Sequence, residues 1–208
     1  MSSVIDLRAY VNPSVIQTLV LVDLQQEYIA SPRVLALEET KSALANCRAA
    51  LAHARAMGLP VAFVRWIDRT PIFNKASRFS RWIEGFEPHG VDMIFERNRP
   101  SCYASADFAE VMGGGGGSFV LAGFAGEAAC LATAIDGFHR GHSITFLGDA
   151  SASHALDDIA AKDVHRVVST VAGLYGDVLT TKSWIARTAR KNSWRGMSDA
   201  NEHGRTAG

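Results

Sequence analysis

The segment from Ser118 to Gly141 constrains the fold of this chain more than any other part. Ser118–Ala122 is a short, continuous apolar run of the kind that a buried β-strand shows. Apolar residues then recur at helical spacing from Leu131 to Phe138, and Gly141 ends that pattern. The segment therefore predicts a strand, a tight turn and a helix, with Cys130 in the first turn of the helix.

The predicted position of Cys130 has chemical consequences. The free N–H groups and the positive dipole end of a helix favour an anion, so we expect this thiol to ionise more readily than a free cysteine. The small residues Gly126, Ala128 and Ala129 allow a substrate to approach the backbone, whose N–H groups can stabilise an oxyanion. The alternative is a small core residue, which is the commoner role of a cysteine in such a place.

Short apolar runs alternate with stretches of helical periodicity along the rest of the chain. The other predicted strands are Thr18–Asp23, Val61–Trp66, Met93–Glu96, Ser143–Asp149 and Asp177–Thr180, and the other predicted helices are Leu35–Met57, Asp107–Met112 and Ala155–Leu174. This alternation predicts a three-layer α/β fold in which helices cover both faces of a mostly parallel sheet. We expect one domain over residues 1–187, followed by a polar tail over 188–208 that frays.

The composition excludes several classes of function. Lysine plus arginine equals aspartate plus glutamate, at 21 each in 208 residues, which argues against a nucleic-acid or membrane-surface partner. No apolar run approaches the roughly 20 residues of a membrane span, and the N-terminus has no signal-peptide pattern. The three cysteines are too widely spaced for a disulfide framework or a zinc site. We expect a cytoplasmic protein.

Two further features indicate where a ligand would bind. Asp23 ends the first predicted strand, and the carboxyl ends of parallel strands form the crevice in which open α/β sheets bind ligands. Residues 67–91 form a long segment without clear periodicity, and a loop of that length in a compact domain is usually functional. The glycine run 113–117 precedes a strand instead of opening a helix, so a slack turn is favoured over a phosphate cradle.

Over residues 17–180 the chain resembles the isochorismatase-like cysteine hydrolase family, which includes isochorismatases, nicotinamidases and N-carbamoylsarcosine amidase. Four stretches carry the resemblance: Thr18–Gln25, Arg97–Tyr103, Gly123–Thr133 and Arg140–Ser153. The resemblance implies a catalytic site in which Asp23 accepts the proton of Cys130 and the thiolate attacks a carbonyl carbon. It also implies oxyanion donors near Ala129 and Cys130, and a cis peptide bond at Gly126–Glu127.

The chain departs from the family at one catalytic position, because the lysine of the family's triad falls on Arg97. Arginine keeps the positive charge, but it does not give up its proton, and a tight pair with Asp23 would lower the pKa of that carboxyl. Three alternatives remain: Arg97 replaces the lysine functionally, Arg99 or Lys75 takes the role, or catalysis is lost. We favour the first.

The remaining candidates concern the pocket and its ligands. Glu127 either contacts the substrate or caps the helix, and capping is favoured. Aromatic residues of the loops either line an apolar pocket or pack against a partner subunit. The substrate-pocket candidates are Gln25, Tyr28, Trp66, Phe73, Trp82 and Tyr103. We expect no metal and no cofactor, because the histidines lack paired ligand spacing. The resemblance implies a homo-oligomer, a dimer or tetramer.

These observations predict a metal-independent cysteine hydrolase that cleaves a C–N bond of a small amide, ureide or related acyl compound. One alternative is an isochorismatase-type hydrolase of a vinyl ether, in which Asp23 is a general acid and Cys130 is dispensable. A second alternative is a non-catalytic ligand-binding or scaffold protein in which Arg97 marks lost activity. The sequence does not name the substrate.

Overall fold

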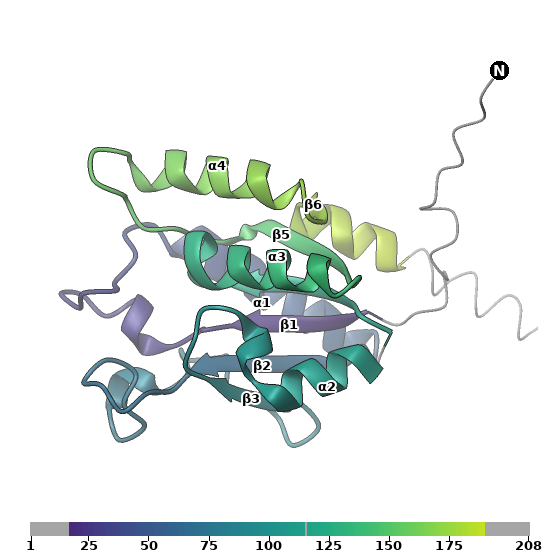
Figure 1. The fold of residues 1–208 in the computed structure, drawn as a ribbon, viewed down its shortest axis with the longest axis horizontal. Helices are drawn as coiled ribbons and strands as arrows, with labels where there is room; N and C mark the ends of the chain where they lie inside the picture. The colour runs from purple at the N-terminus through teal and green to yellow at the C-terminus, as the bar shows by residue number, and fades with distance from the viewer. Residues whose placement is uncertain (1–16, 115, 190–208) are drawn as a thin grey trace, which may run out of the picture.

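A computed structural model describes residues 17–114 and 116–189 and has a six-stranded sheet at its centre (Figure 1). All neighbouring strands are parallel, in the order β3-β2-β1-β4-β5-β6. The strands are β1 (Thr18–Val22), β2 (Val61–Trp66), β3 (Met93–Arg97), β4 (Ser118–Gly123), β5 (Ser143–Ser151) and β6 (Asp177–Leu179). The predicted parallel sheet is confirmed, and each predicted strand is present with small shifts at its ends.

The sheet is buried on both faces. Leu19, Val20, Leu21 and Val22 of β1 have no exposed surface, although successive side chains of a strand point to opposite faces. Parallel strands in α/β folds show such continuous apolar runs because helices cover both sides. The β1 strand therefore lies at the centre of the molecule and fixes the position of the residues that follow it.

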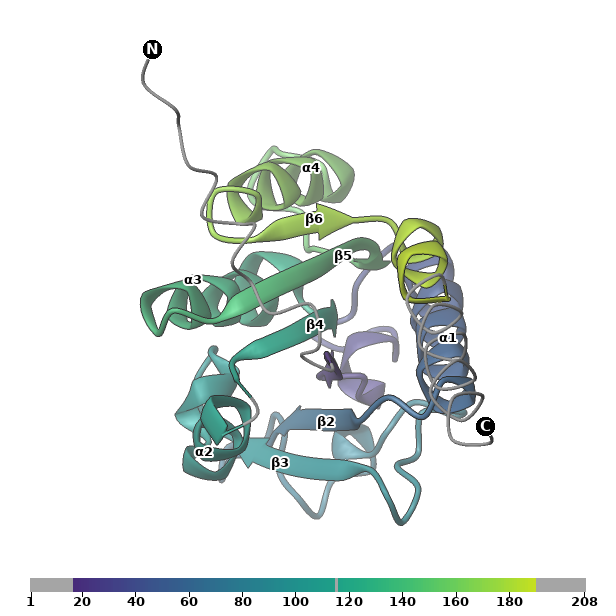
Figure 2. The same ribbon diagram turned by 90° about the vertical axis from the view of Figure 1, so that its right-hand side faces the viewer.

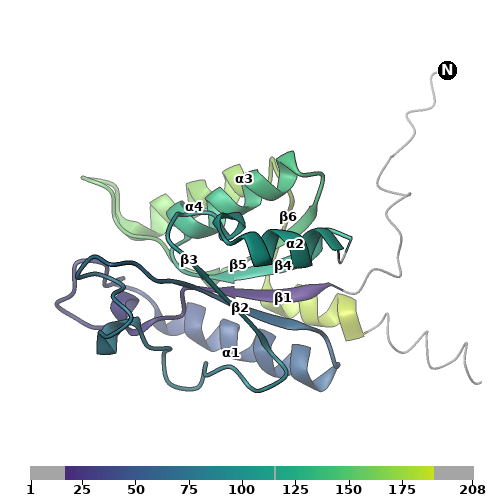
Figure 3. The ribbon, with the colours of Figure 1, turned by 60° about the horizontal axis from the view of Figure 1, so that its bottom comes forward.

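Helices cover the two faces unequally. The helix α1 (Lys41–Ala56) and the helical residues 181–189 lie on one face, and α2 (Ala106–Gly114), α3 (Leu131–His139) and α4 (Ala161–Ala172) lie on the other (Figures 2 and 3). This arrangement is the predicted three-layer α/β architecture. None of the described helices has the length and apolar character needed to cross a membrane.

Two predicted helices are shorter in the structure, and most of the predicted tail lies outside the described residues. α1 begins at Lys41 instead of Leu35, because the preceding residues fold back and Leu37 N–H donates to the carbonyl of Tyr28 at 2.8 Å. α4 begins at Ala161 instead of Ala155, because Leu156 and Ile159 pair with each other. Residues 188 and 189 belong to the last helix, and residues 1–16 and 190–208 lie outside the described part.

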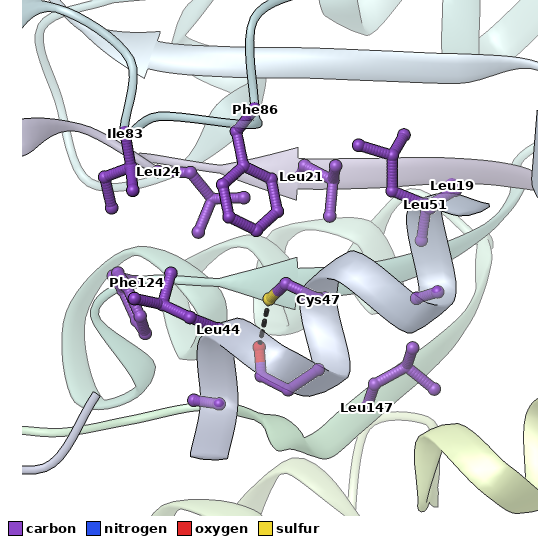
Figure 4. Close-up of a cluster of buried hydrophobic side chains, with 14 of the residues drawn as sticks. Leu19, Leu21, Leu24, Leu44, Cys47, Leu51, Ile83, Phe86, Phe124 and Leu147 are labelled. Atoms are coloured by element: carbon purple, nitrogen blue, oxygen red, sulfur yellow. Dashed lines mark hydrogen bonds between the residues drawn. The ribbon is translucent and has the colours of Figure 1, made fainter. Parts of the chain in front are cut away.

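A large apolar cluster fills the space between α1 and the sheet (Figure 4). Cys47 of α1 lies in it among leucine side chains, and its thiol donates to the carbonyl of Ala150 at 3.1 Å. Phe86 and Ile83, from the long segment 67–91, also belong to this cluster. Part of that segment is therefore packed core, which explains how a long loop without regular structure is held against the sheet.

Candidate active site

Three predicted residues meet at the carboxyl edge of the sheet. Asp23 follows β1, Cys130 follows β4, and Arg97 is the last residue of β3. β1 and β4 are direct neighbours, with Val22 opposite Gly123, so the acid and the thiol leave adjacent strands. Phe124 N–H donates to the carbonyl of Val22 at 2.9 Å, which continues this pairing beyond the strand ends.

Asp23 and Arg97 form a fully buried ion pair. Arg97 Nη2 lies 2.5 Å from Asp23 Oδ2, and neither side chain has exposed surface. Arg97 also donates from Nη1 to the carbonyl of Arg99 at 2.9 Å, and its guanidinium lies 4.7 Å from the centre of the Trp66 ring. These contacts leave Arg97 fixed against the acid.

The expected direction of the Asp23 pKa is wrong, however. Complete burial raises the pKa of Asp23 above its ordinary value, and the Arg97 guanidinium counteracts that rise only in part. Burial disfavours the ionised carboxylate because it removes the carboxyl group from water. One oxygen, Oδ1, has no hydrogen-bond partner within the described part of the chain. Asp23 thus combines a raised proton affinity with a free oxygen.

Cys130 is also buried, with 1% of its surface exposed. Its thiol donates to the carbonyl of Gly123 at 3.5 Å, and Ser151 Oγ lies 3.9 Å from the sulfur. Burial raises the pKa of Cys130 well above its ordinary value. The prediction that this thiol ionises readily is therefore wrong for this structure, because desolvation dominates and the guanidinium of Arg97 faces Asp23 instead of the sulfur.

Cys130 ends a π-helical turn instead of lying in the first turn of α3. This turn, Gly126–Cys130, precedes α3 directly, and we call it the nucleophile turn. The carbonyl of Ala125 accepts the N–H groups of Ala128 at 3.3 Å and Cys130 at 3.2 Å. The N–H of Cys130, an expected oxyanion donor, is thus already hydrogen-bonded. π-turns inside helices are rare and often occur at functional sites.

The cis peptide bond lies at Phe124–Ala125, so the expected position at Gly126–Glu127 is wrong. Gly126 has a different constraint. Its N–H donates to the carbonyl of Ala152 at 2.8 Å, and a Cβ at this position would lie 2.8 Å from Ser153 Oγ. The turn therefore packs directly against the residues that follow β5, which leaves no room for a side chain at 126.

Three of the six pocket candidates form a chain of contacts that runs from Asp23 to Arg97. Tyr28 Oη lies 3.5 Å from Asp23 Oδ2, and its ring centre lies 5.7 Å from that of Phe73. Phe73 in turn stacks on Trp66 at 5.7 Å. These aromatic rings and the Arg97 guanidinium form a continuous wall beside Asp23.

The other three candidates make contacts elsewhere. Gln25 is buried, and its amide bonds both the N–H and the carbonyl of Trp66 and the carbonyl of Ser80. Trp82 packs edge-on against Phe63, and Tyr103 Oη lies 2.6 Å from His142 Nδ1. Gln25 holds the end of β2 in place, whereas Trp82 and Tyr103 are packed in contacts away from Asp23.

Sequence reasoning missed the partner of Glu127. His154 Nδ1 lies 2.6 Å from Glu127 Oε1, and His154 Nε2 lies 3.0 Å from the carbonyl oxygen of Leu35. Glu127 is therefore paired with His154, and it lies in the first turn of the π-helix, where a carboxylate is favoured. The only sequence signal was the position of His154 just after the carboxyl end of β5. Within residues 17–114 and 116–189, no group of three or more His, Cys, Asp or Glu side chains could hold a metal ion.

Comparison with known proteins agrees with the fold. The fold and site define an α/β protein with an acid and a cysteine at the carboxyl ends of adjacent central strands. The Isochorismatase domain family matches residues 17–183, and the chain belongs to this isochorismatase-like cysteine hydrolase family. A search of curated proteins found no match.

Solved structures show the same fold. An isochorismatase from Pseudomonas putida is 25% identical with a TM-score of 0.75, covering 81% of this chain and 89% of that one. A cysteine hydrolase from Pseudomonas syringae pv. phaseolicola shares the fold at 24% identity and a TM-score of 0.78, over 84% and 93% of the two chains. An isochorismatase family protein from Desulfovibrio vulgaris shares it at 14% identity and a TM-score of 0.73, over 84% and 98%.

Proposed function

We propose that this protein is a metal-independent cysteine hydrolase that cleaves a C–N bond of a small amide, ureide or related acyl compound. The observation that carries the proposal is the buried Asp23–Arg97 pair, together with the position of Asp23 and Cys130 after the neighbouring strands β1 and β4. A carboxylate and a thiol in this relation are a base and its nucleophile. The homo-oligomer and the cytoplasmic location remain predictions.

The proposed reaction has two stages. Asp23 accepts the proton of Cys130, and the sulfur forms a bond to the carbonyl carbon of the substrate. The C–N bond then breaks as the nitrogen takes the proton from Asp23, which leaves a thioester. Water, deprotonated by Asp23, attacks the thioester, the acid product leaves, and Cys130 recovers its proton.

The electrostatics of the site support this order of events. A thiol whose pKa is raised by burial stays protonated in the resting site, so it needs a base at the moment of attack. The raised pKa of Asp23 makes it a stronger base than an exposed aspartate. Arg97 then has a supporting role, because it keeps the buried carboxylate ionised but remains protonated itself.

The raised pKa of Asp23 also favours a second candidate, the hydrolysis of a vinyl ether. A protonated Asp23 would donate its proton to the enol carbon, water would add to the resulting cation and return a proton to Asp23, and the hemiketal would collapse. That reaction needs no thiolate, so Cys130 would be dispensable.

One experiment separates the two reactions. The wild type, Cys130→Ala and Asp23→Asn are incubated with a panel of amides, ureides and isochorismate. Turnover of an amide or ureide that both substitutions abolish supports the thioester mechanism. Turnover of isochorismate that survives Cys130→Ala supports the vinyl-ether reaction instead. No turnover of any compound, with wild-type Cys130 no more reactive toward iodoacetamide than Cys47, would favour a non-catalytic protein.

A further inference from the structure

His154 connects two segments that carry parts of the site. It follows the carboxyl end of β5, and its half-buried ring lies between Glu127 of the nucleophile turn and the carbonyl of Leu35. Leu35 belongs to residues 28–37, which we call the Tyr28 segment. The hydrogen bond from Leu37 N–H to the Tyr28 carbonyl closes this segment on itself.

The two hydrogen bonds determine the protonation state of the ring. The carbonyl oxygen of Leu35 can only accept, so Nε2 of His154 must carry a proton. An ionised Glu127 can also only accept, so Nδ1 must carry a second proton. The alternative, a protonated Glu127 that donates to a neutral ring, would require Glu127 to hold its proton.

The surroundings favour the ionised form of Glu127. Partial burial acts to raise the pKa of Glu127, but the hydrogen bonds to His154, to the backbone N–H of Glu127 and to Ser153, together with the charge of His154, outweigh it and the pKa is lowered. The hydrogen bond between Glu127 and His154 raises the pKa of His154 above its ordinary value. The arrangement is therefore a carboxylate paired with an imidazolium.

The ring also contacts the aromatic wall of the site. The ring centre of Tyr28 lies 6.2 Å from that of His154 and 6.0 Å from that of Phe124. Tyr28 reaches Asp23 with its hydroxyl, and Glu127 precedes Cys130 by three residues. His154 therefore contacts Tyr28, which lies beside Asp23, and Glu127, which lies in the same turn as Cys130, although it touches neither Asp23 nor Cys130 itself.

We propose that His154, as an imidazolium, is a positioning residue that ties the nucleophile turn to the Tyr28 segment. A neutral ring has one proton, so it can donate to Glu127 or to Leu35 but not to both. Loss of the second proton therefore releases one of the two segments, and the relation between Cys130 and Asp23 loosens. The positioning role presupposes the proposed function, in which Cys130 is the nucleophile, whereas the protonation state of His154 does not.

The direction of the pH dependence follows from the raised pKa of His154. Where Glu127 is ionised, the tie is complete below the ordinary histidine pKa of about 6.5 and is lost as the pH rises through the raised folded-state value. Within the described residues, the titratable groups in contact with the ring are Glu127 from the nucleophile turn and Tyr28 from the Tyr28 segment. Burial raises the pKa of Tyr28 well above its ordinary value, so Tyr28 stays neutral over this range.

The first test needs no substrate. Long-range ¹H–¹⁵N spectra of the histidine rings, with His154→Gln to assign the signals, report the protonation of each ring nitrogen. We expect both nitrogens of His154 to be protonated near pH 7, with a titration midpoint that moves to lower pH in Glu127→Gln. A neutral ring near pH 7, or a midpoint that Glu127→Gln leaves unchanged, would overturn the assignment.

The second test measures the effect on the nucleophile. Iodoacetamide labelling of Cys130, located by mass spectrometry, should be severalfold faster in His154→Gln and Glu127→Gln than in wild type at low pH. The wild-type rate should approach theirs as His154 loses its proton. His53→Gln is the matched control, because His53 is a partly buried histidine that bonds Thr188 instead of the site. Equal labelling in all four proteins would reject the positioning role even if an active substrate is found.

Once a substrate is known, kinetics supply a third readout. We expect His154→Gln to lower kcat severalfold with a smaller change in KM. We also expect it to remove the alkaline limb of the pH profile, which is the fall in kcat that deprotonation of His154 causes in the wild type. An unchanged alkaline limb in His154→Gln would contradict the proposal. Absence of any substrate would count against the proposed function only, because the ring spectra and the labelling rates stand without it.

Discussion

Cys47 and Cys130 share nearly complete burial but lie in regions of opposite character. Each thiol donates to a backbone carbonyl, and burial raises the pKa of each, that of Cys47 to about 12. Cys47 lies among leucine side chains between α1 and the sheet (Figure 4), whereas Cys130 ends a π-turn beside a buried acid. Burial and a raised pKa therefore do not distinguish a core cysteine from a nucleophile. Under the proposed function, the two thiols differ in position, because Cys130 follows the strand next to the one that Asp23 follows.

Loss of either member of the acid–thiol pair should have the largest effect. We expect Cys130→Ala and Asp23→Asn each to lower kcat/KM by roughly 10³-fold or more, because each removes a group on which the covalent step depends. Cys47→Ala should retain activity close to that of the wild type. Steady-state kinetics on the amide or ureide that the wild type hydrolyses provide the measurement. A Cys130→Ala enzyme as active as Cys47→Ala would contradict the proposal that Cys130 is the nucleophile and Cys47 a core residue.

Breaking the buried ion pair should have the next largest effect, this time on stability. Arg97→Leu leaves Asp23 as an unpaired buried acid, so we expect the free energy of unfolding to fall by about 3–5 kcal/mol. Urea titration followed by circular dichroism measures this loss. Arg97→Lys keeps the charge and is the matched control. If Arg97→Lys also keeps full activity, no specific guanidinium contact is needed for catalysis.

Cys47→Ala should cost less, on the order of 1–2 kcal/mol, because it removes a buried sulfur and one hydrogen bond. We expect the loss in unfolding free energy without a loss in activity, which is the reverse of the result for Cys130→Ala. Thermal or urea unfolding of both variants beside the wild type makes the comparison. A stability loss in Cys130→Ala as large as that in Cys47→Ala would show that Cys130 also acts as a packing residue.

The smallest effect concerns the Glu127–His154 pair at the edge of the site. The lowered pKa of Glu127 means that its contribution is present above its ordinary value of about 4.5 and is lost as the pH falls through the folded-state value. Unfolding free energies of wild type and Glu127→Gln should differ by about 1 kcal/mol or less near neutral pH and converge in acid. A difference that stays constant across this range would mean that the ionised carboxylate contributes nothing.

The sequence was sufficient to predict the sheet, but not the electrostatics of the residues at its carboxyl edge. Asp23 could be placed because it follows a strand whose apolar run is visible in the sequence, whereas Arg97 was identified only through the family resemblance. The pKa directions of Asp23 and Cys130 could not be predicted, because both depend on how completely distant segments exclude water from them. Local patterns indicate where a side chain leaves the sheet, whereas burial is a property of the assembled fold.

Other features escaped prediction because distant contacts create them. The sequence of the π-turn that ends at Cys130 is also typical of the start of an ordinary α-helix, since its small residues fit either helical geometry. The late start of α1 depends on the bond between Leu37 and Tyr28, and the partner of Glu127 lies 27 residues further along the chain. No periodicity in the sequence encodes such pairings.

Direct observation of the covalent intermediate tests the central claim most simply. The protein is mixed with the amide or ureide that it hydrolyses and is quenched in acid within the first turnover. The masses of its peptides are then measured by mass spectrometry. The account predicts that the peptide containing Cys130 gains the mass of the acyl group, that the peptide containing Cys47 does not, and that Cys130→Ala gains none. Continued turnover in Cys130→Ala with no acylated peptide in the wild type would contradict it.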